Sequence, residues 1–185
     1  YLTFNVLGML LALTAWLGLL RGSGWKRALA YVWIPILIPL LAILGTTGKT
    51  KTSTGMIYET ESAYNYIQVL EIDGYRYLRL NEGQGQHSVY HPTEYYYAGP
   101  WSQVLVAPFF NPAPYNLEHV ERIAIVGLAA GTTARQASQV YPQAVVDGYE
   151  IDPKIIEVGK TWFGMDLPNL NAYAQDGRWG LEHSP

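Results

Sequence analysis

The alternation of apolar and polar segments is clearest between residues 122 and 152. Ile123–Val126 and Ala144–Tyr149 are short apolar runs of the kind that form buried parallel strands. Thr132–Tyr141 lies between them with a helical pattern, and Pro142 ends it. A turn rich in small residues separates the first run from the helix. This order predicts a βαβ unit and places the chain in the α/β class.

The same alternation continues toward the C-terminus. Asp152 followed by proline is typical of a helix start, so a helix is predicted over Pro153–Phe163. Asn171–Ala174 is predicted as a third short strand. Asp176-Gly177 stands at the end of that strand, and Arg178 begins another predicted helix.

Residues 56 to 90 have a different pattern, dominated by aromatic and β-branched side chains. Tyr64–Glu71 and Tyr75–Leu80 flank Asp73-Gly74, which is a strong hairpin signal. Gln86–Tyr90 is predicted as a further strand. The segment therefore predicts a small antiparallel sheet. Glu94–Ala107 follows and is predicted to be a helix interrupted by a Gly-Pro pair.

Two long apolar runs begin the chain. Tyr1–Leu20 carries no charge and is long enough to cross a hydrocarbon core of about 30 Å as a helix. Ala28–Leu44 is the second run, and a short basic loop joins the two. One interpretation of the two runs is a signal peptide followed by a buried helix. The tandem runs with aromatic flanks favour a transmembrane hairpin, followed by a polar linker over Gly45–Gly55.

Charge and composition narrow the function. The first 51 residues hold five basic and no acidic residues, whereas the rest holds all 15 acids against seven Lys and Arg. The negative charge of residues 52–185 argues against a nucleic-acid partner. There is no cysteine, and the four histidines show no metal-ligand spacing, so no metal site is predicted. A start at Tyr rather than Met, and an end just after the third predicted strand, suggest a piece of a longer protein.

The glycine turn and the second predicted strand together indicate a nucleoside site. Gly127 and Gly131 let the backbone approach a ligand, and Glu150, about 20 residues on, can accept both hydroxyls of a ribose. Leu128 stands where a dinucleotide site has its middle glycine. The pattern therefore fits a ligand without phosphate, such as an S-adenosyl compound, better than NAD. A tight turn in some other α/β domain remains the alternative.

Six elements, taken in order, resemble the polyamine aminopropyltransferases, the spermidine synthase family. They are Tyr58-Glu-Thr-Glu-Ser-Ala-Tyr64-Asn-Tyr-Ile, Leu80-Asn-Glu-Gly-Gln-Gly-Gln86, Thr93-Glu-Tyr-Tyr-Tyr97-Ala-Gly99, Val126-Gly-Leu-Ala-Ala-Gly-Thr132, Tyr149-Glu-Ile-Asp152 and Asp176-Gly177. The apolar hairpin lies outside the similarity and looks like a bacterial subgroup in which such a domain follows transmembrane helices.

The resemblance implies a β-rich N-terminal subdomain over 57–110 and, over 111–185, the first part of a Rossmann-like domain of the class I methyltransferase type. The hairpin would occupy 1–46 and the linker 47–56. The implied donor is decarboxylated S-adenosylmethionine, used as a co-substrate with no permanently bound cofactor. The implied acceptor is a polyamine or another amine. By position, the donor-binding residues would be Asn65, Gly127, Gly131, Glu150, Asp176 and Gly177, and Tyr97 would face the acceptor.

The sequence also departs from the family pattern. Ala98 and Gly99 replace two polar residues, and Ala130 replaces an aspartate that would hold an amine. The family's catalytic aspartate follows a later strand, so no catalytic residue is assigned here. A methyltransferase that uses S-adenosylmethionine, and a membrane-linked nucleoside-binding domain without activity, remain the alternatives.

The predicted location is a multi-pass membrane protein with its soluble part in the cytoplasm, where S-adenosyl compounds are available. The positive-inside rule weakly favours the opposite orientation, so the charges leave the side of the membrane open. The expected partners are the amine substrate and the membrane. A homo-oligomer is left open.

Overall fold

The computed structural model describes residues 2–22, 24–46, 53–81, 85–114 and 116–183. The chain forms two compact units, Tyr1–Thr52 and Ser53–Pro185, each with its own contacts. Most of the predicted linker and the turn at residues 82–84 lie outside the described residues.

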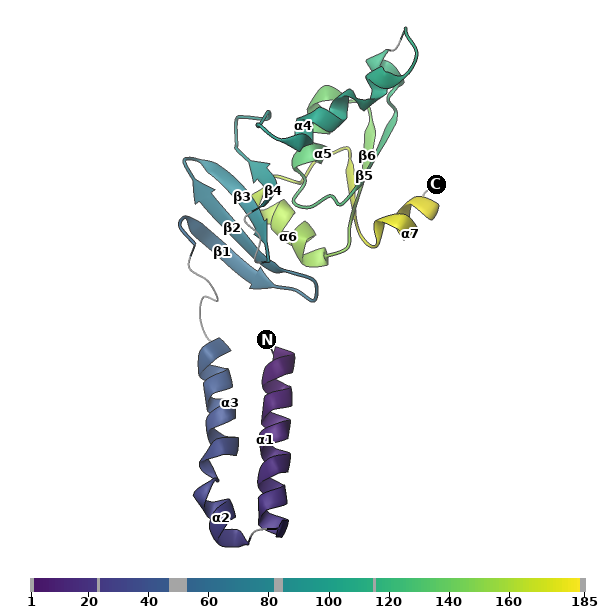
Figure 1. The fold of residues 1–185 in the computed structure, drawn as a ribbon. Coiled ribbons are helices and arrows are strands. Elements are labelled where there is room, and N and C mark those ends of the chain that lie inside the picture. The colour runs from purple at the N-terminus through teal and green to yellow at the C-terminus, as the bar shows by residue number, and fades with distance from the viewer. Residues whose placement is uncertain (1, 23, 47–52, 82–84, 115, 184–185) are drawn as a thin grey trace. The chain divides into compact units, whose positions relative to one another are not determined.

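The first unit consists of three helices, α1 (Leu2–Gly22), α2 (Trp25–Ala30) and α3 (Trp33–Thr46) (Figure 1). The indole Nε1 of Trp16 in α1 donates a hydrogen bond of 2.8 Å to the carbonyl oxygen of Ala28 in α2. The unit is thus held partly by a contact between its first two helices.

The predicted transmembrane hairpin is not supported by this unit. The second apolar run is divided between α2 and α3, and α3 has only 14 residues. At about 1.5 Å per residue, α3 is shorter than a hydrocarbon core of about 30 Å. Within the described ranges, no helix meets the length and apolar character needed to cross a membrane. The predicted membrane location is therefore wrong.

The second unit begins with an antiparallel sheet in the order β1-β2-β3-β4 (Figure 1). Its strands are β1 (Met56–Glu61), β2 (Tyr66–Ile72), β3 (Tyr75–Leu80) and β4 (Gln86–Tyr90). The predicted hairpin forms at Asp73-Gly74, where both residues have positive φ angles of 52° and 84°. β3 and β4 have the predicted bounds.

The predicted helix over Glu94–Ala107 is wrong. The chain from residue 91 to 99 is not helical, and a single helical turn, α4 (Pro100–Gln103), leads into the 3-10 helix η1 (Val104–Phe110). Gly99 has a φ of 154°, and a residue before proline is disfavoured in the helical region, so the helix cannot extend upstream. A second 3-10 helix, η2 (Leu117–His119), precedes the parallel sheet.

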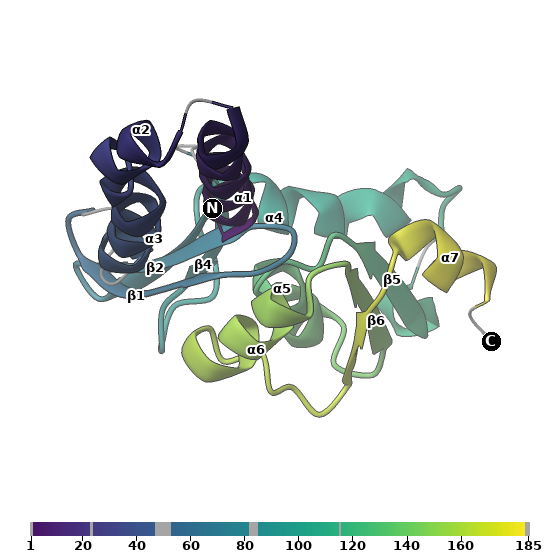
Figure 2. The ribbon, with the colours of Figure 1, turned by 90° about the horizontal axis from the view of Figure 1, so that it is seen from below.

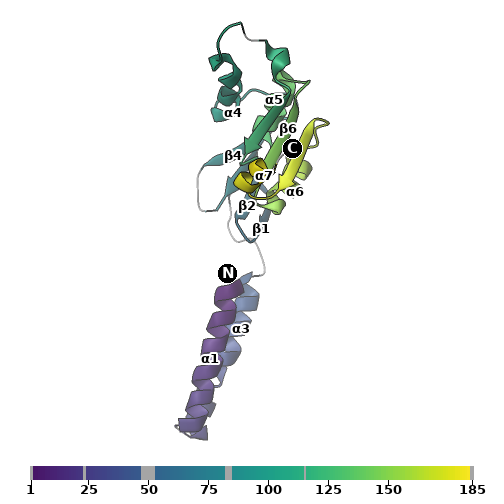
Figure 3. The ribbon, with the colours of Figure 1, turned by 90° about the vertical axis from the view of Figure 1, so that its right-hand side faces the viewer.

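The parallel sheet has the order β5-β6-β7, and its strands run the same way (Figure 3). They are β5 (Arg122–Val126), β6 (Val145–Glu150) and β7 (Leu170–Ala174). Three helices follow the strands in turn, α5 (Thr132–Val140), α6 (Pro153–Trp162) and α7 (Gly177–Glu182). The structure therefore contains a Rossmann-like βαβαβ arrangement.

Two apolar clusters hold this unit together. The first joins α5 to β6 through Ala134, Ala137 and Val146. The second joins the antiparallel sheet to α6, with Ile67 packed in the same cluster as Ile155. Because strand side chains alternate between faces, the other face of β6 meets α7 (Figure 2). The carboxyl ends of all three parallel strands are left at one edge of the sheet.

Candidate functional site

The glycine turn after β5 forms a tight loop against the end of β6. The backbone N–H groups of Gly127 and Leu128 donate to the carbonyl oxygen of Tyr149, at 2.9 and 3.0 Å. Gly131 has a φ of 87°, and a Cβ there would lie 2.5 Å from Cγ of Met165. Glycine is therefore required at 131 both by the backbone angle and by the close packing.

Glu150 ends β6 and contacts this loop directly. Its Oε2 accepts a hydrogen bond of 3.0 Å from the N–H of Ala129, and its Oε1 accepts one of 3.1 Å from the N–H of Asp152. The residue is only 8% exposed. Two backbone donors therefore fix the carboxylate beside Gly127–Gly131, as expected for adjacent ends of parallel strands.

Asn65 reaches the same region from the turn between β1 and β2. Its Nδ2 donates to Oδ2 of Asp152 at 2.9 Å, and Ser62 Oγ donates to the same oxygen at 2.5 Å. The sequence pattern indicates Asp152 only as a helix cap and does not distinguish Ser62. Both lie within segments that resemble the family, but residues about 90 positions apart in the chain give no local signal that they are in contact.

Asp176 and Gly177 lie at the end of β7. The N–H of Gln175 donates to the carbonyl oxygen of Glu150 at 3.0 Å, which ties the two strand ends together. A Cβ at Gly177 would lie 2.5 Å from Cγ1 of Val126, so the start of α7 packs against the end of β5. Asp176 caps α7 by accepting from the N–H of Trp179 at 3.0 Å.

Tyr97 bonds to the segment that follows β4 and to α5. Its hydroxyl donates to the carbonyl oxygen of Glu94 at 2.7 Å and accepts from the N–H of His91 at 2.9 Å and from Arg135 at 3.4 Å. Burial raises the pKa of the Tyr97 phenol, against the opposing effects of His91 and Arg135. Tyr97 is therefore held in a hydrogen-bond network between the segment that follows β4 and α5.

Ala130 is fully buried in the cluster that joins the antiparallel sheet to α6. Its N–H donates to Oγ of Ser88 at 2.9 Å. The loop residue that replaces the family's aspartate is thus part of the apolar core, bound to β4 through its backbone.

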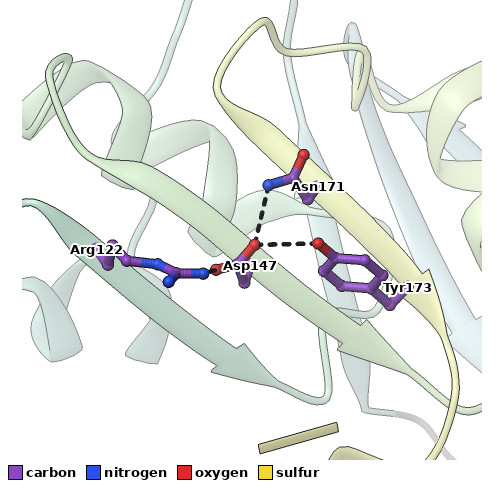
Figure 4. A network of polar contacts seen from close by, with 4 residues as sticks. All are labelled: Arg122, Asp147, Asn171 and Tyr173. Carbon is purple, nitrogen blue, oxygen red and sulfur yellow. Dashed lines mark hydrogen bonds and ion pairs between the residues drawn. The ribbon is translucent and has the colours of Figure 1, made fainter. Parts of the chain in front are cut away.

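A polar network lies on the face of the parallel sheet opposite to the face that packs against α5 (Figure 4). Asp147 in β6 accepts hydrogen bonds from Arg122 at 2.7 Å, Asn171 at 2.9 Å and Tyr173 at 3.4 Å. Burial acts to raise the pKa of Asp147, but the hydrogen bonds from Asn171 and Arg122 and the arginine charge leave that pKa below its ordinary value. The network links all three parallel strands.

The arrangement offers an anchored carboxylate, a small-residue loop and a second acid at three neighbouring strand ends. Within the described ranges, no group of three or more His, Asp or Glu side chains is placed to hold a metal ion. The carboxylates of Glu150 and Asp176 can accept hydrogen bonds from a polar organic ligand.

Comparisons with known proteins agree with this reading of the fold. A probable polyamine aminopropyl transferase of Bifidobacterium longum is 30% identical over 161 residues, which is 86% of this chain and 34% of that protein. A polyamine aminopropyltransferase of Vibrio vulnificus is 29% identical over 135 residues, 70% of this chain and 43% of that protein. No family model matches the chain.

A solved structure shows the same fold. The crystal structure of a probable spermidine synthase from Corynebacterium glutamicum matches with a TM-score of 0.56 at 18% identity, over 72% of this chain and 48% of the other. The chain thus spans between about a third and a half of the proteins it matches. In sequence this chain is similar to polyamine aminopropyltransferases, and in fold to a probable spermidine synthase.

Proposed function

We propose that this protein is an aminopropyltransferase that moves the aminopropyl group of decarboxylated S-adenosylmethionine to a polyamine. The observation that carries the proposal is Glu150, held at the end of β6 against the loop Gly127–Gly131 by the N–H of Ala129. Residues 57–110 would form the family's β-rich subdomain, and residues 111–185 the first part of its nucleoside-binding domain.

The hydrogen bonds of Glu150 suit a ribose. A carboxylate has about four acceptor positions, two on each oxygen. Each oxygen of Glu150 already accepts one backbone N–H. One position on each oxygen is then available for one hydroxyl, so the carboxylate can bind the two neighbouring hydroxyls of a ribose together.

Asp176 and Gly177 would bind the adenine of the donor. The cap contact with Trp179 uses one acceptor position of the Asp176 carboxylate, and others remain for an exocyclic amine. Asn65 contributes indirectly, because its amide is bound to Asp152. Tyr97, which the family resemblance puts on the acceptor side, would face the polyamine and not the donor.

The proposed reaction is a displacement at carbon. The nitrogen of the amine forms a bond to the aminopropyl carbon attached to the sulfonium, and the carbon–sulfur bond breaks. Its electron pair goes to sulfur, which leaves as a neutral thioether, and the amine nitrogen loses a proton to a base. The described residues hold the nucleoside, and positioning of the two reactants supplies much of the rate. No residue of this chain is assigned as the base.

Calorimetry on the full-length protein tests the proposal. Decarboxylated S-adenosylmethionine should bind more tightly than S-adenosylmethionine. The Glu150→Gln variant should bind the donor about 1–3 kcal/mol more weakly, because one oxygen that accepts a hydroxyl is replaced by an NH₂ group. Unchanged affinity in this variant would remove Glu150 from the site, and a preference for S-adenosylmethionine would contradict aminopropyl transfer.

A further inference from the structure

A continuous line of hydrogen bonds runs from the β1–β2 turn to Glu150, with Asp152 at its centre. Oδ2 of Asp152 accepts from Ser62 Oγ at 2.5 Å and from Asn65 Nδ2 at 2.9 Å, and Oδ1 accepts from the N–H of Lys154 at 3.0 Å. The N–H of Asp152 itself donates to Oε1 of Glu150 at 3.1 Å. The side chain and the backbone of one residue thus connect two parts of the fold.

The two bonds from the β1–β2 turn exceed what a helix cap needs. A cap requires only the bond from Lys154 to the Asp152 carboxylate. Asp152 is fully buried, and a buried carboxylate is stable only when its oxygens have good partners. Ser62 and Asn65 supply those partners, so the position of the carboxylate depends on the antiparallel sheet.

Asn65 is itself held at both ends of its amide. Its Oδ1 accepts a hydrogen bond of 2.9 Å from Nδ2 of Asn81, which follows β3. Asn81 also accepts from the N–H of Tyr66 at 3.0 Å. With both ends of its amide engaged by protein groups, Asn65 is directed at Asp152.

We propose that Asp152 is a positioning residue that fixes the Glu150 carboxylate in place to bind the ribose. The hydrogen bonds that Ser62 and Asn65 donate to the Asp152 carboxylate hold it in position, and we call them the clasp. This proposal rests on the proposed function. Loss of the clasp would let the backbone at 150–152 shift, and a shift of about 0.5 Å is enough to spoil the geometry of a binding site. Asp152 acts through Glu150 and does not itself touch the nucleoside.

A double-mutant cycle with 5′-methylthioadenosine as the probe tests the proposal in the full-length protein. Asp152→Asn places an NH₂ group against the two donors, and we expect nucleoside binding about tenfold weaker, the cost of one displaced hydrogen bond to a charged group. In a Glu150→Gln background the same change should weaken binding by less than about twofold, because both substitutions then affect one interaction. Additive effects would overturn the proposal.

A swap of the two side chains gives a readout that a merely structural role would not move. Asn65→Asp combined with Asp152→Asn restores an amide donor facing a carboxylate. We expect the pair to recover most of the lost affinity, whereas Asn65→Asp alone brings two carboxylates together and should weaken binding. Failure of the pair to recover any affinity would contradict the clasp.

The matched control is Glu157→Gln. Like Asp152→Asn it replaces a carboxylate by an amide, but the Glu157 side chain lies further along α6 and is 62% exposed. It should leave the dissociation constant unchanged. If Asp152→Asn does not fold, Ser62→Ala keeps the cap and should still weaken binding measurably. Wild-type affinity in the Asp152 and Ser62 variants with weak binding in Glu150→Gln would overturn only the positioning proposal. Wild-type affinity in Glu150→Gln as well would overturn the proposed function.

Discussion

The pKa of a side chain in the parallel sheet depends on the residues that contact it. Asp147 shows this, because hydrogen bonds from Asn171 and Arg122 outweigh the effect of burial and hold its pKa below the ordinary value. The carboxylate is therefore favoured in the folded state. Its contribution to stability is present above the ordinary carboxyl pKa and is lost as the pH falls through the lowered one.

Asp147 should therefore contribute to acid unfolding. We expect the wild-type protein to lose stability as the pH falls below about 4, where carboxylates take up protons. Asp147→Asn should be less stable than wild type at pH 7 and show a smaller change in melting temperature on acidification. Thermal unfolding at several pH values checks this, and parallel curves for the two proteins would contradict it.

Ala130 gives a second expectation for a single residue. The family pattern has an aspartate at this position, but here the residue is packed among apolar side chains of the sheet and α6. Ala130→Asp would bury a charge without a partner, and we expect a loss of about 3 kcal/mol or more in unfolding free energy. Urea denaturation measures it. Ala174→Asp, at an exposed position near the same edge, is the control and should change little.

Between elements, cations and aromatic rings alternate across the region where the antiparallel sheet meets the helices. The guanidinium of Arg135 in α5 lies 4.4 Å from the ring centres of both Tyr90 and Tyr95. That of Arg76 in β3 lies 5.7 Å from the rings of Tyr90 and Trp162. Tyr90 thus has an arginine near it from each of two elements, which adds to the apolar contacts there.

The stack around Arg135 should be important for stability. Arg135→Leu removes two cation–π contacts and the hydrogen bond to the carbonyl oxygen of His91, and we expect a loss of about 2–4 kcal/mol. Arg135→Lys should retain part of this, since an ammonium keeps the charge but not the planar stacking. Chemical denaturation checks both, with Arg178→Leu on the exposed surface as the control. Equal stability of all variants would contradict a stabilising role for Arg135.

Most elements of the second unit follow from local patterns, as the bounds of β3 and β4 show. The helix predicted over Glu94–Ala107 does not form upstream of Pro100, because Gly99 and Pro100 fix a backbone conformation that is not helical there. The juxtaposition of Glu150 and the glycine loop was predictable, because parallel strands end at one edge. The contact between Asn65 and Asp152 was not, because it depends on how two separate sheets pack.

For the whole molecule, the two units should be separable in function. Both apolar clusters, and the residues at the three strand ends, belong to the second unit. We therefore expect that removing residues 1–52 from the full-length protein leaves the dissociation constant for 5′-methylthioadenosine within about twofold of wild type. Calorimetry on both forms checks this. A tenfold loss of affinity with unchanged folding would show that the first unit contributes to binding.

The strand order has a consequence for the proposed amine acceptor. Within the described residues β5 pairs with β6 alone and is an outer strand, yet the loop that follows it is the one beside Glu150. A crevice in an open α/β sheet has two walls, one from each side of the point where the strand order reverses. Here β6 and β7 supply one wall. A strand added beside β5 would form the other and would bring its own side chains to the mouth of the crevice, where the proposed function would have the amine recognised.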